Sequence, residues 1–277
     1  PTPGSGFTYY VDPVSGSNTR TLVEARSQAT PWKTISFAMT KVSAGDVISL
    51  APGTYAEQAD FAQSALTLRG QGTLGGVVIA APTGTAGVNV DGFHDARIEN
   101  LVVQGGAQGV TATMADGIRV TGVAVVSPST VGIRVRQTND ARIDSCIVTG
   151  APNYGLLIVR TSNAYVRNNL VYANAGWGIS VDADGFATST GNVVAFNTIH
   201  QNGSGLRLLN ASGDIRDNNF TETVDLALYL AGPNLSAHHN NFSANGRDRD
   251  KASAFAGSIV VWSNIGKNPR YEEPAGL

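Results

Sequence analysis

Arginine, carboxylate and aromatic side chains recur at neighbouring phases of a repeating pattern in the middle of the chain, and their chemistry suits an acidic sugar. Elimination from a uronic acid needs a cation that neutralises the substrate carboxylate and a base that removes the adjacent proton. The candidate catalytic residues are Arg136, Asp182, Arg207 and Tyr229. The candidate substrate contacts are Arg134, Tyr154, Arg160, Trp177 and Asp184.

Roles within this set follow from residue type. Arg134, Arg136 and Arg207 are suited to neutralising a carboxylate, and Tyr229 or an arginine is left as the base, because the central repeats contain no lysine. An ordinary alternative stays open, in which these outward charges solvate a sheet and pair with each other.

Asp182 and Asp184 offer two oxygens to a calcium ion, yet they lack the ligand count of a full calcium loop. An Asx turn is the simpler interpretation, and no other metal ligands are predicted. Tyr154 and Trp177 each stand two residues before an opening strand, with a glycine between. Their rings suit stacking on a sugar face, or else they pack over a turn.

The element that positions these residues is a repeat of 22 or 23 residues, lengthened once to 27. A period of this size, rich in β-branched residues and without helical runs, predicts a solenoid in which each repeat is one coil. The long repeat opens at Ile179, and its extra residues follow Asp182, so we expect a loop beside the site. The repeats open at Val88, Val110, Ile133, Leu156, Ile179, Leu206 and Leu228.

Alternation within each opening strand decides which side chains face outward. Ile133 and Val135 are predicted to point inward and Arg134 and Arg136 outward, because successive strand residues face opposite sides. Stacked coils lie about 4.8 Å apart, so residues one repeat apart become neighbours. The outward columns therefore run Asn89, Thr111, Arg134, Leu157, Ser180, Arg207, Tyr229 and Asp91, Thr113, Arg136, Val159, Asp182, Leu209.

An asparagine recurs at one other phase and predicts a ladder of amides that satisfies buried turn backbone: Asn169, Asn197, Asn218 and Asn240. Cys146 holds the same phase in an earlier repeat, which predicts an inert ladder residue rather than a nucleophile. The histidines show no metal-ligand spacing and are interpreted as structural.

The chain divides into an N-terminal cap with the first coils (1–87), regular coils (88–262) and a tail (263–277), all one domain. Apolar residues at helical spacing from Pro31 to Ser43 predict a helix that covers the open end of the first coil. The start at Pro1 suggests a mature form or an expressed piece. The net charge of -2 gives no basic field for nucleic acid, and no run approaches the about 20 apolar residues of a membrane span.

The pattern Gly-Ile-x-Val followed by Ile/Val-x-x-Asn-x-Ile resembles the right-handed parallel β-helix proteins of the pectate-lyase-like superfamily. The N-terminal region is similar to theirs in four stretches: Tyr10-Val11-Asp12-Pro13, Pro31-Trp32-Lys33-Thr34-Ile35, Ala44-Gly45-Asp46-Val47-Ile48 and Ala51-Pro52-Gly53-Thr54-Tyr55. The resemblance implies an all-β fold, and a polysaccharide along the outer face of one sheet. It also implies a secreted or cell-surface bacterial protein.

The resemblance leaves the activity open, because fold does not name a reaction. The Gly-His-Gly and Asp-Asp signatures of polygalacturonases and the Asp-Pro-His-Asp stretch of alginate epimerases are absent, which disfavours both. We expect a protein that engages a uronic-acid polysaccharide, with lyase-type β-elimination as the leading reaction. A non-catalytic carbohydrate-binding or adhesin module and a structural β-helix are the alternatives.

Overall fold

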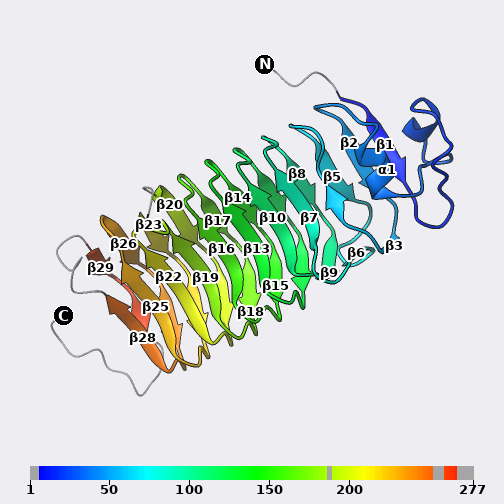
Figure 1. Ribbon diagram of the computed structural model, residues 1–277. Helices are drawn as coiled ribbons and strands as arrows, with labels where there is room; N and C mark the ends of the chain where they lie inside the picture. Colours follow the sequence, from blue (N-terminus) through cyan, green and yellow to red (C-terminus); the bar gives the residue numbers. More distant parts are fainter. Residues whose placement is uncertain (1–5, 186–188, 252–258, 267–277) are drawn as a thin grey trace.

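The computed structural model describes residues 6–185, 189–251 and 259–266, and these form one elongated stack of parallel strands (Figure 1). The strands belong to three sheets, here called A, B and C, of 11, 10 and 9 described strands. Each coil passes from sheet C to sheet A to sheet B before it reaches the next level. The predicted all-β, right-handed parallel β-helix is confirmed.

Sheet A contains, in spatial order, β1 (Thr8–Val11), β2 (Val47–Leu50), β5 (Thr67–Gly70), β8 (Arg97–Glu99), β11 (Arg119–Thr121), β14 (Arg142–Asp144), β17 (Tyr165–Arg167), β20 (Ser189–Ala195), β23 (Ala211–Arg216), β26 (Leu235–His238) and β29 (Ile259–Trp262). Sheet B contains β3 (Gly53–Tyr55), β6 (Val77–Ala81), β9 (Val102–Gly105), β12 (Ala124–Val126), β15 (Ile147–Thr149), β18 (Leu170–Tyr172), β21 (Thr198–His200), β24 (Asn219–Thr221), β27 (Asn241–Ser243) and β30 (Ile265–Gly266). Sheet C contains β4 (Ala59–Asp60), β7 (Ala86–Asp91), β10 (Gln108–Thr113), β13 (Val131–Arg136), β16 (Tyr154–Val159), β19 (Trp177–Asp182), β22 (Ser204–Leu209), β25 (Leu226–Ala231) and β28 (Arg247–Lys251).

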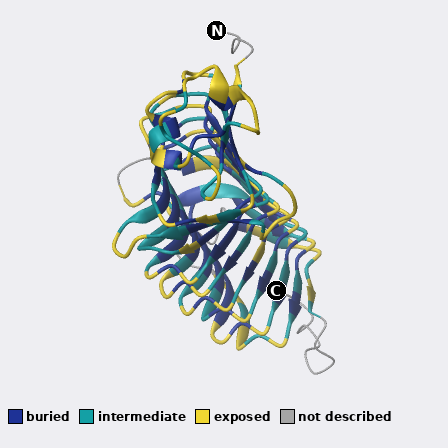
Figure 2. Cartoon of the chain, turned by 90° about the vertical axis from the view of Figure 1, so that its right-hand side faces the viewer, coloured by how far each residue is buried: buried dark blue, intermediate teal, exposed yellow. Residues whose placement is uncertain are grey.

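The core is the inside of the coils, as the alternation predicts. Ile133 and Val135 are fully buried, and the aliphatic residues at the same phase in neighbouring strands are buried with them. Figure 2 shows buried and more exposed positions alternating along the strands. Burial of one face of every strand fixes the register, because a slip of one residue would turn the whole apolar set outward.

The asparagine ladder lies in the turn between sheets A and B. The Nδ2 of Asn197 donates to Asn218 Oδ1 over 2.9 Å, and the Nδ2 of Asn218 donates to Asn240 Oδ1 over 2.9 Å. Cys146 continues the ladder, because its backbone N–H donates to Asn169 Oδ1 over 2.9 Å. Both predictions, the ladder and the place of Cys146 in it, are confirmed.

The N-terminal helix is shorter than predicted. Helix α1 spans Ile35–Met39, capped by the Thr34 side chain, rather than Pro31 to Ser43. Trp32 is held in extended backbone instead, because its N–H donates to Tyr10 O and its carbonyl accepts from Asp12 N, both over 2.9 Å. The strand bridge therefore occupies the Trp32 carbonyl, which a helix starting at Pro31 would have used to accept the N–H four residues later.

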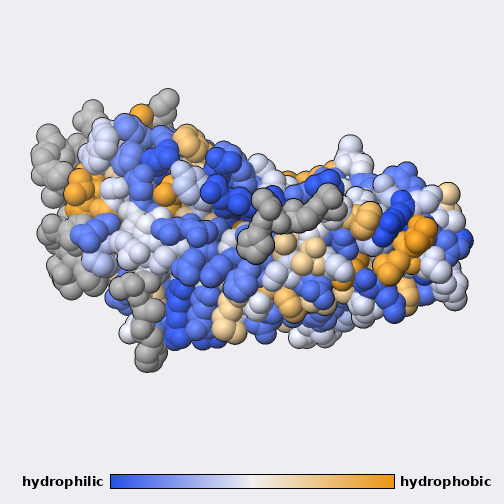
Figure 3. Space-filling view, turned by 90° about the horizontal axis from the view of Figure 1, so that it is seen from above, coloured by the Kyte–Doolittle hydropathy of each residue, from blue (hydrophilic) through white to orange (hydrophobic). Residues whose placement is uncertain are grey.

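The N-terminal segment also carries one further short helix and an apolar surface. The 3₁₀ helix η1 spans Glu24–Arg26. Exposed large hydrophobic side chains in this segment are Phe7, Val14, Leu22 and Val23. Figure 3 shows a group of hydrophobic residues at this end, at the right of the view.

Candidate functional site

The outer face of sheet C brings the predicted site residues into two columns. Arg134, Ser180 and Arg207 occupy one column, with Leu157 between the first two, and Tyr229 follows Arg207 on the next strand. The second column holds Arg136 and Asp182, separated by Val159 on β16. Each predicted neighbour relation holds, because parallel strands pair residues one repeat apart.

Arg207 is the centre of a connected cluster on this face. Its Nε donates to Ser180 Oγ over 2.9 Å, and its Nη2 donates to the Tyr154 hydroxyl over 2.9 Å. Its Nη2 lies 3.9 Å from Asp182 Oδ2. A guanidinium held by a hydroxyl on either side loses little further freedom when it meets a planar anion. The Nη1 group has no hydrogen-bond partner among the described residues.

Two aromatic rings flank this guanidinium. The Arg207 Cζ lies 5.2 Å from the centre of the Tyr154 ring and 5.6 Å from that of Trp177. Tyr154 and Trp177 are paired in register on β16 and β19. Both distances are within the range of a cation–π attraction. The rings, the guanidinium and the Asp182 carboxylate thus form one patch that combines flat apolar surface with paired charge.

Ser180 departs from the sequence-based expectation. The alternation places it outward, yet it is fully buried. The reason is that the Arg207 side chain from the next strand lies across it and takes its hydroxyl as an acceptor. The repeat pattern alone does not mark Ser180 as a site residue. A small hydroxyl residue one repeat before an outward arginine is the signal that would have done so.

The remaining predicted residues lie farther from this centre. Arg134 and Arg136 are both on β13, two strands from Ser180 and Asp182. The Nε of Arg134 is buried and makes no hydrogen bond within the described part of the chain. Tyr229, on β25, is the register partner of Arg207. The structure therefore divides the site into a central cluster around Arg207, an arginine pair three strands before Arg207 and a tyrosine one strand after it.

The two aspartates form the turn that the sequence favours. The backbone N–H of Asp184 donates to Asp182 Oδ1 over 2.7 Å, an Asx turn. Asp184 Oδ2 accepts from Arg160 Nη2 over 2.9 Å. Each carboxylate thus faces a guanidinium, and positive charge competes with calcium at this turn. The predicted loop includes residues 186–188, which lie outside the described residues.

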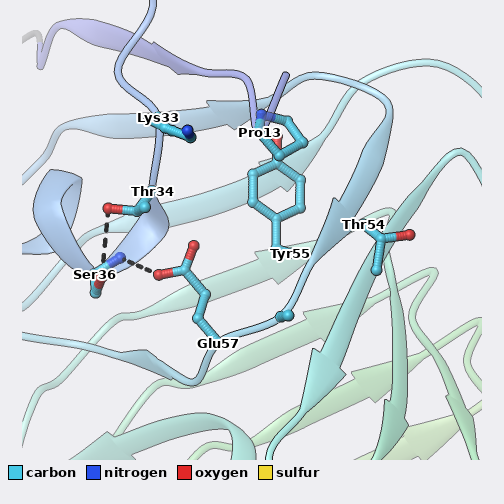
Figure 4. Close-up of a pocket in the computed structure, with 8 residues that line it drawn as sticks. Pro13, Lys33, Thr34, Ser36, Thr54, Tyr55 and Glu57 are labelled. Carbon is cyan, nitrogen blue, oxygen red and sulfur yellow. Dashed lines mark hydrogen bonds between the residues drawn. The ribbon is translucent and has the colours of Figure 1, made fainter. Parts of the chain in front are cut away.

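A pocket of about 310 Å³ lies at the N-terminal end, between α1 and β3 (Figure 4). The carboxylate and the phenol that line this pocket already make hydrogen bonds within the protein. The Glu57 carboxylate accepts from the N–H groups of Ile35 and Ser36 over 2.8 and 2.9 Å. The Tyr55 hydroxyl contacts the carbonyls of Val11 and Ala51, both at 2.9 Å, and burial raises its pKa. We assign this pocket to stabilising the cap.

Sequence comparison assigns the family. The profile of the NosD family, described as periplasmic copper-binding protein (NosD), matches residues 71–270. The chain belongs to this family. The match covers the regular coils, including every strand of the sheet C site. No curated protein matches the chain.

Solved structures resemble the NosD-family chain in fold. Pectate lyase Pel9A superposes with a TM-score of 0.69 at 13% identity, covering 98% of this chain and 82% of the other. The DFA-IIIase from Arthrobacter chlorophenolicus A6 in complex with GF2 gives 0.62 at 13% identity, covering 93% and 79%. XylC with xylose gives 0.59 at 9% identity, covering 89% and 70%. At identities this low, the superpositions show a shared parallel β-helix fold, as the resemblance predicts.

The family description names copper, for which imidazole nitrogens and thiolates are suitable ligands. Within the described residues, no three His, Cys, Asp or Glu side chains are grouped to hold an ion. Cys146 is unsuited, because burial raises the pKa of its thiol to about 12. Two imidazoles do meet, at His238 and His239, whose Nδ1 atoms lie 2.9 Å apart. This nitrogen pair matches copper by ligand type, but the two nitrogens do not by themselves make a group of metal ligands in the described residues.

The family description is periplasmic, and the described part of the chain contains no helix long and apolar enough to span a membrane.

Proposed function

We propose that this protein binds an acidic, uronic-acid-containing polysaccharide along the outer face of sheet C. The observation that carries the proposal is the Arg207 cluster, in which a guanidinium is held by Ser180 and Tyr154 and flanked by two aromatic rings. Rings supply a stacking surface for sugar faces, and the Nη1 group of Arg207 is available to a carboxylate. Carbohydrate-handling structures with the same fold support a sugar ligand.

The polymer is expected to run along the solenoid axis, across successive strands. Arg134 and Arg136 precede the cluster, and the apolar side chains of Leu157 and Val159 lie between the two charged regions. Charged groups on strands two levels apart are about 10 Å apart at strand spacing. Such a surface would contact carboxylates on separate sugar units. A periplasmic, secreted or cell-surface location follows for a protein with this ligand.

For catalysis, we propose β-elimination as the reaction. Arg207 would neutralise the carboxylate of the sugar unit that reacts and so acidify the proton on the adjacent carbon, while Arg136, three strands earlier, would bind the carboxylate of another unit. Tyr229 would remove that proton while the bond to the leaving sugar oxygen breaks and a carbon–carbon double bond forms. Asp182, 3.9 Å from Arg207, holds that guanidinium in place.

The test compares one polyuronate with its carboxyl-reduced form. We expect binding of the acidic polymer, quenching of tryptophan fluorescence and weak binding of the reduced polymer. Arg207→Ala should weaken binding about 10-fold to 100-fold, because a hydrogen bond to a charged group contributes about 1.5–3 kcal/mol. Arg142→Ala on sheet A is the matched control. Equal affinity for both polymers, or equal effects of the two substitutions, would exclude the proposed face.

Ultraviolet absorbance of an unsaturated product separates catalysis from binding. A rise that is lost in Tyr229→Phe supports elimination. Binding without any rise, across a panel of polyuronates, identifies a carbohydrate-binding module instead.

A further inference from the structure

A column of three arginines lies on the outer face of sheet A, away from the sheet C site. Arg97 on β8, Arg119 on β11 and Arg142 on β14 are register partners on three consecutive strands. Neighbouring strands are about 4.8 Å apart, so these side chains leave the sheet one beside the other. Arg97 and Arg142 are exposed, and Arg119 is half-buried. We call this column the arginine ladder, and it shares no residue with the proposed carbohydrate site.

The protein does not neutralise the arginine ladder. Among the described residues, none of its three members forms an ion pair with a carboxylate. The two outward carboxylates on the same strands are already paired with other arginines. Glu99 Oε2 accepts from Arg69 Nε over 2.7 Å, and Asp144 Oδ2 lies 2.7 Å from Arg167 Nη2.

This arrangement is unfavourable for the protein alone. Like charges directly opposite each other on neighbouring strands destabilise a sheet. Elsewhere on sheet A the chain places a carboxylate beside an arginine, as Glu99 beside Arg69 shows. The ladder therefore has an electrostatic cost that the described part of the chain does not compensate, and a bound anion would remove this cost.

The surrounding face of sheet A is also basic. The outward side chains of β5, β8, β11, β14 and β17 include five arginines and two carboxylates, whereas the whole chain has a net charge of -2. Beyond Arg142 the column continues with Tyr165, whose ring centre lies 5.9 Å from the Arg142 Cζ. The net charge of the chain thus conceals a local site of positive potential, which favours an anionic ligand.

Carboxylates border the ladder on both sides and restrict the shape of that ligand. Asp95 and Asp140 are exposed in the turns before β8 and β14, two residues before the first and last arginines of the ladder. Glu99 and Asp144 lie on the other side, two residues after the same arginines. A broad anionic surface, such as a membrane, would meet these carboxylates and be repelled. A linear anion along the solenoid axis would meet the arginines alone.

We propose that the arginine ladder binds phosphate monoester groups carried by a linear polymer that lies along the solenoid axis. Three guanidiniums leave two gaps, and a phosphate in each gap can accept hydrogen bonds from the arginine on either side. A phosphate monoester carries a charge of about −1.5 to −2 at neutral pH, so two groups balance the three positive charges. Carboxylates or sulfate esters carry a single charge each, and two of them would leave the ladder partly unneutralised.

The experiment titrates the protein with dextran phosphate at low ionic strength, followed by calorimetry. Dextran sulfate of equal substitution and unmodified dextran test the anionic group on the same polymer. We expect dextran phosphate to bind most tightly and unmodified dextran not to bind. Arg119→Gln should weaken binding about 10-fold to 100-fold, the effect of losing hydrogen bonds to a charged group. Arg247→Ala is the matched control, because Arg247 already pairs with Asp225 over 2.9 Å.

Stability provides a second readout that a structural arginine would not satisfy. Arg119→Gln removes the central positive charge, so its urea midpoint should equal or exceed that of the unchanged protein. A lower midpoint would mean that the fold itself depends on this charge, which contradicts the electrostatic reasoning.

Four binding results would overturn the proposal. These are no binding of dextran phosphate, equal affinity for dextran sulfate, equal binding by Arg119→Gln, and tighter binding to phosphatidylglycerol vesicles than to dextran phosphate. The last result would identify a membrane surface instead of a polymer. Polyuronate binding by Arg119→Gln should be unchanged, so failure here is distinguishable from failure of the carbohydrate proposal.

Discussion

Replacing Asn218 by alanine tests whether the buried amide ladder holds the coils together. Asn218 is 1% exposed. Its Oδ1 accepts from the backbone N–H of Asn197 over 3.0 Å and from the Asn197 side chain over 2.9 Å. Its Nδ2 donates to Val194 O over 2.8 Å and to Asn240 Oδ1 over 2.9 Å. Alanine removes all of these bonds without introducing any other polar group.

The expected cost follows from which partners are left unsatisfied. The backbone N–H of Asn197 loses its acceptor inside the core, which costs about 2 kcal/mol, the middle of the range for a buried group. Loss of the bonds to Val194 and Asn240 adds about 1 kcal/mol each. The Nδ2 of Asn197 adds little, because it keeps the carbonyls of Val166 and Ala195, both at 3.0 Å. The free energy of unfolding should therefore fall by about 4 kcal/mol.

Urea unfolding followed by circular dichroism measures this difference, provided that the transition is single and the m-value is unchanged. Asn139→Ala is the control, because Asn139 is exposed and its side chain makes no hydrogen bond among the described residues. It should change stability by less than about 0.5 kcal/mol. A loss below about 1 kcal/mol in Asn218→Ala, with the native spectrum retained, would show that the ladder is not a principal source of stability.

Three further predictions follow from buried or paired groups. Burial raises the pKa of Cys146 to about 12. Ellman's reagent should therefore label this thiol far more slowly in the native protein than in the urea-unfolded protein. Equal labelling rates would contradict its place in the core. Partial burial acts to raise the pKa of Asp144, but hydrogen bonds led by the one from Arg167 outweigh it, so the pKa lies below its ordinary 3.8. This carboxylate stabilises the fold above pH 3.8 and loses that contribution as the pH falls through its lowered pKa; Asp144→Asn should therefore flatten the decline of stability in acid, measured by urea midpoints at several pH values. Phe220 and Phe242 stack with centres 5.0 Å apart inside the last coils, so Phe220→Ala should cost about 3–5 kcal/mol, and a melting temperature close to that of the unchanged protein would refute this.

The sequence alone determined the architecture of this protein. It also determined which residues stand in register with each other on successive strands. In a parallel β-helix, residues one period apart are neighbours, so a one-dimensional pattern contains the register. Arg207 was predictably beside Ser180, and Asn197 beside Asn218, for that reason. The inward and outward assignment followed from the two-residue alternation of strands.

Only the tertiary structure decided how the side chains lie within those columns. Arg207 crosses Ser180 to reach Tyr154, which lies two strands away, and this choice depends on contacts from three coils at once. Trp32 pairs with the first strand instead of starting a helix, because hydrogen bonds to Tyr10 and Asp12 outweigh local propensity. The His238 ring bonds Asp214, which stands 24 residues before it in the chain. A side-chain conformation that is set by such non-local partners cannot be predicted from the repeat pattern of the sequence.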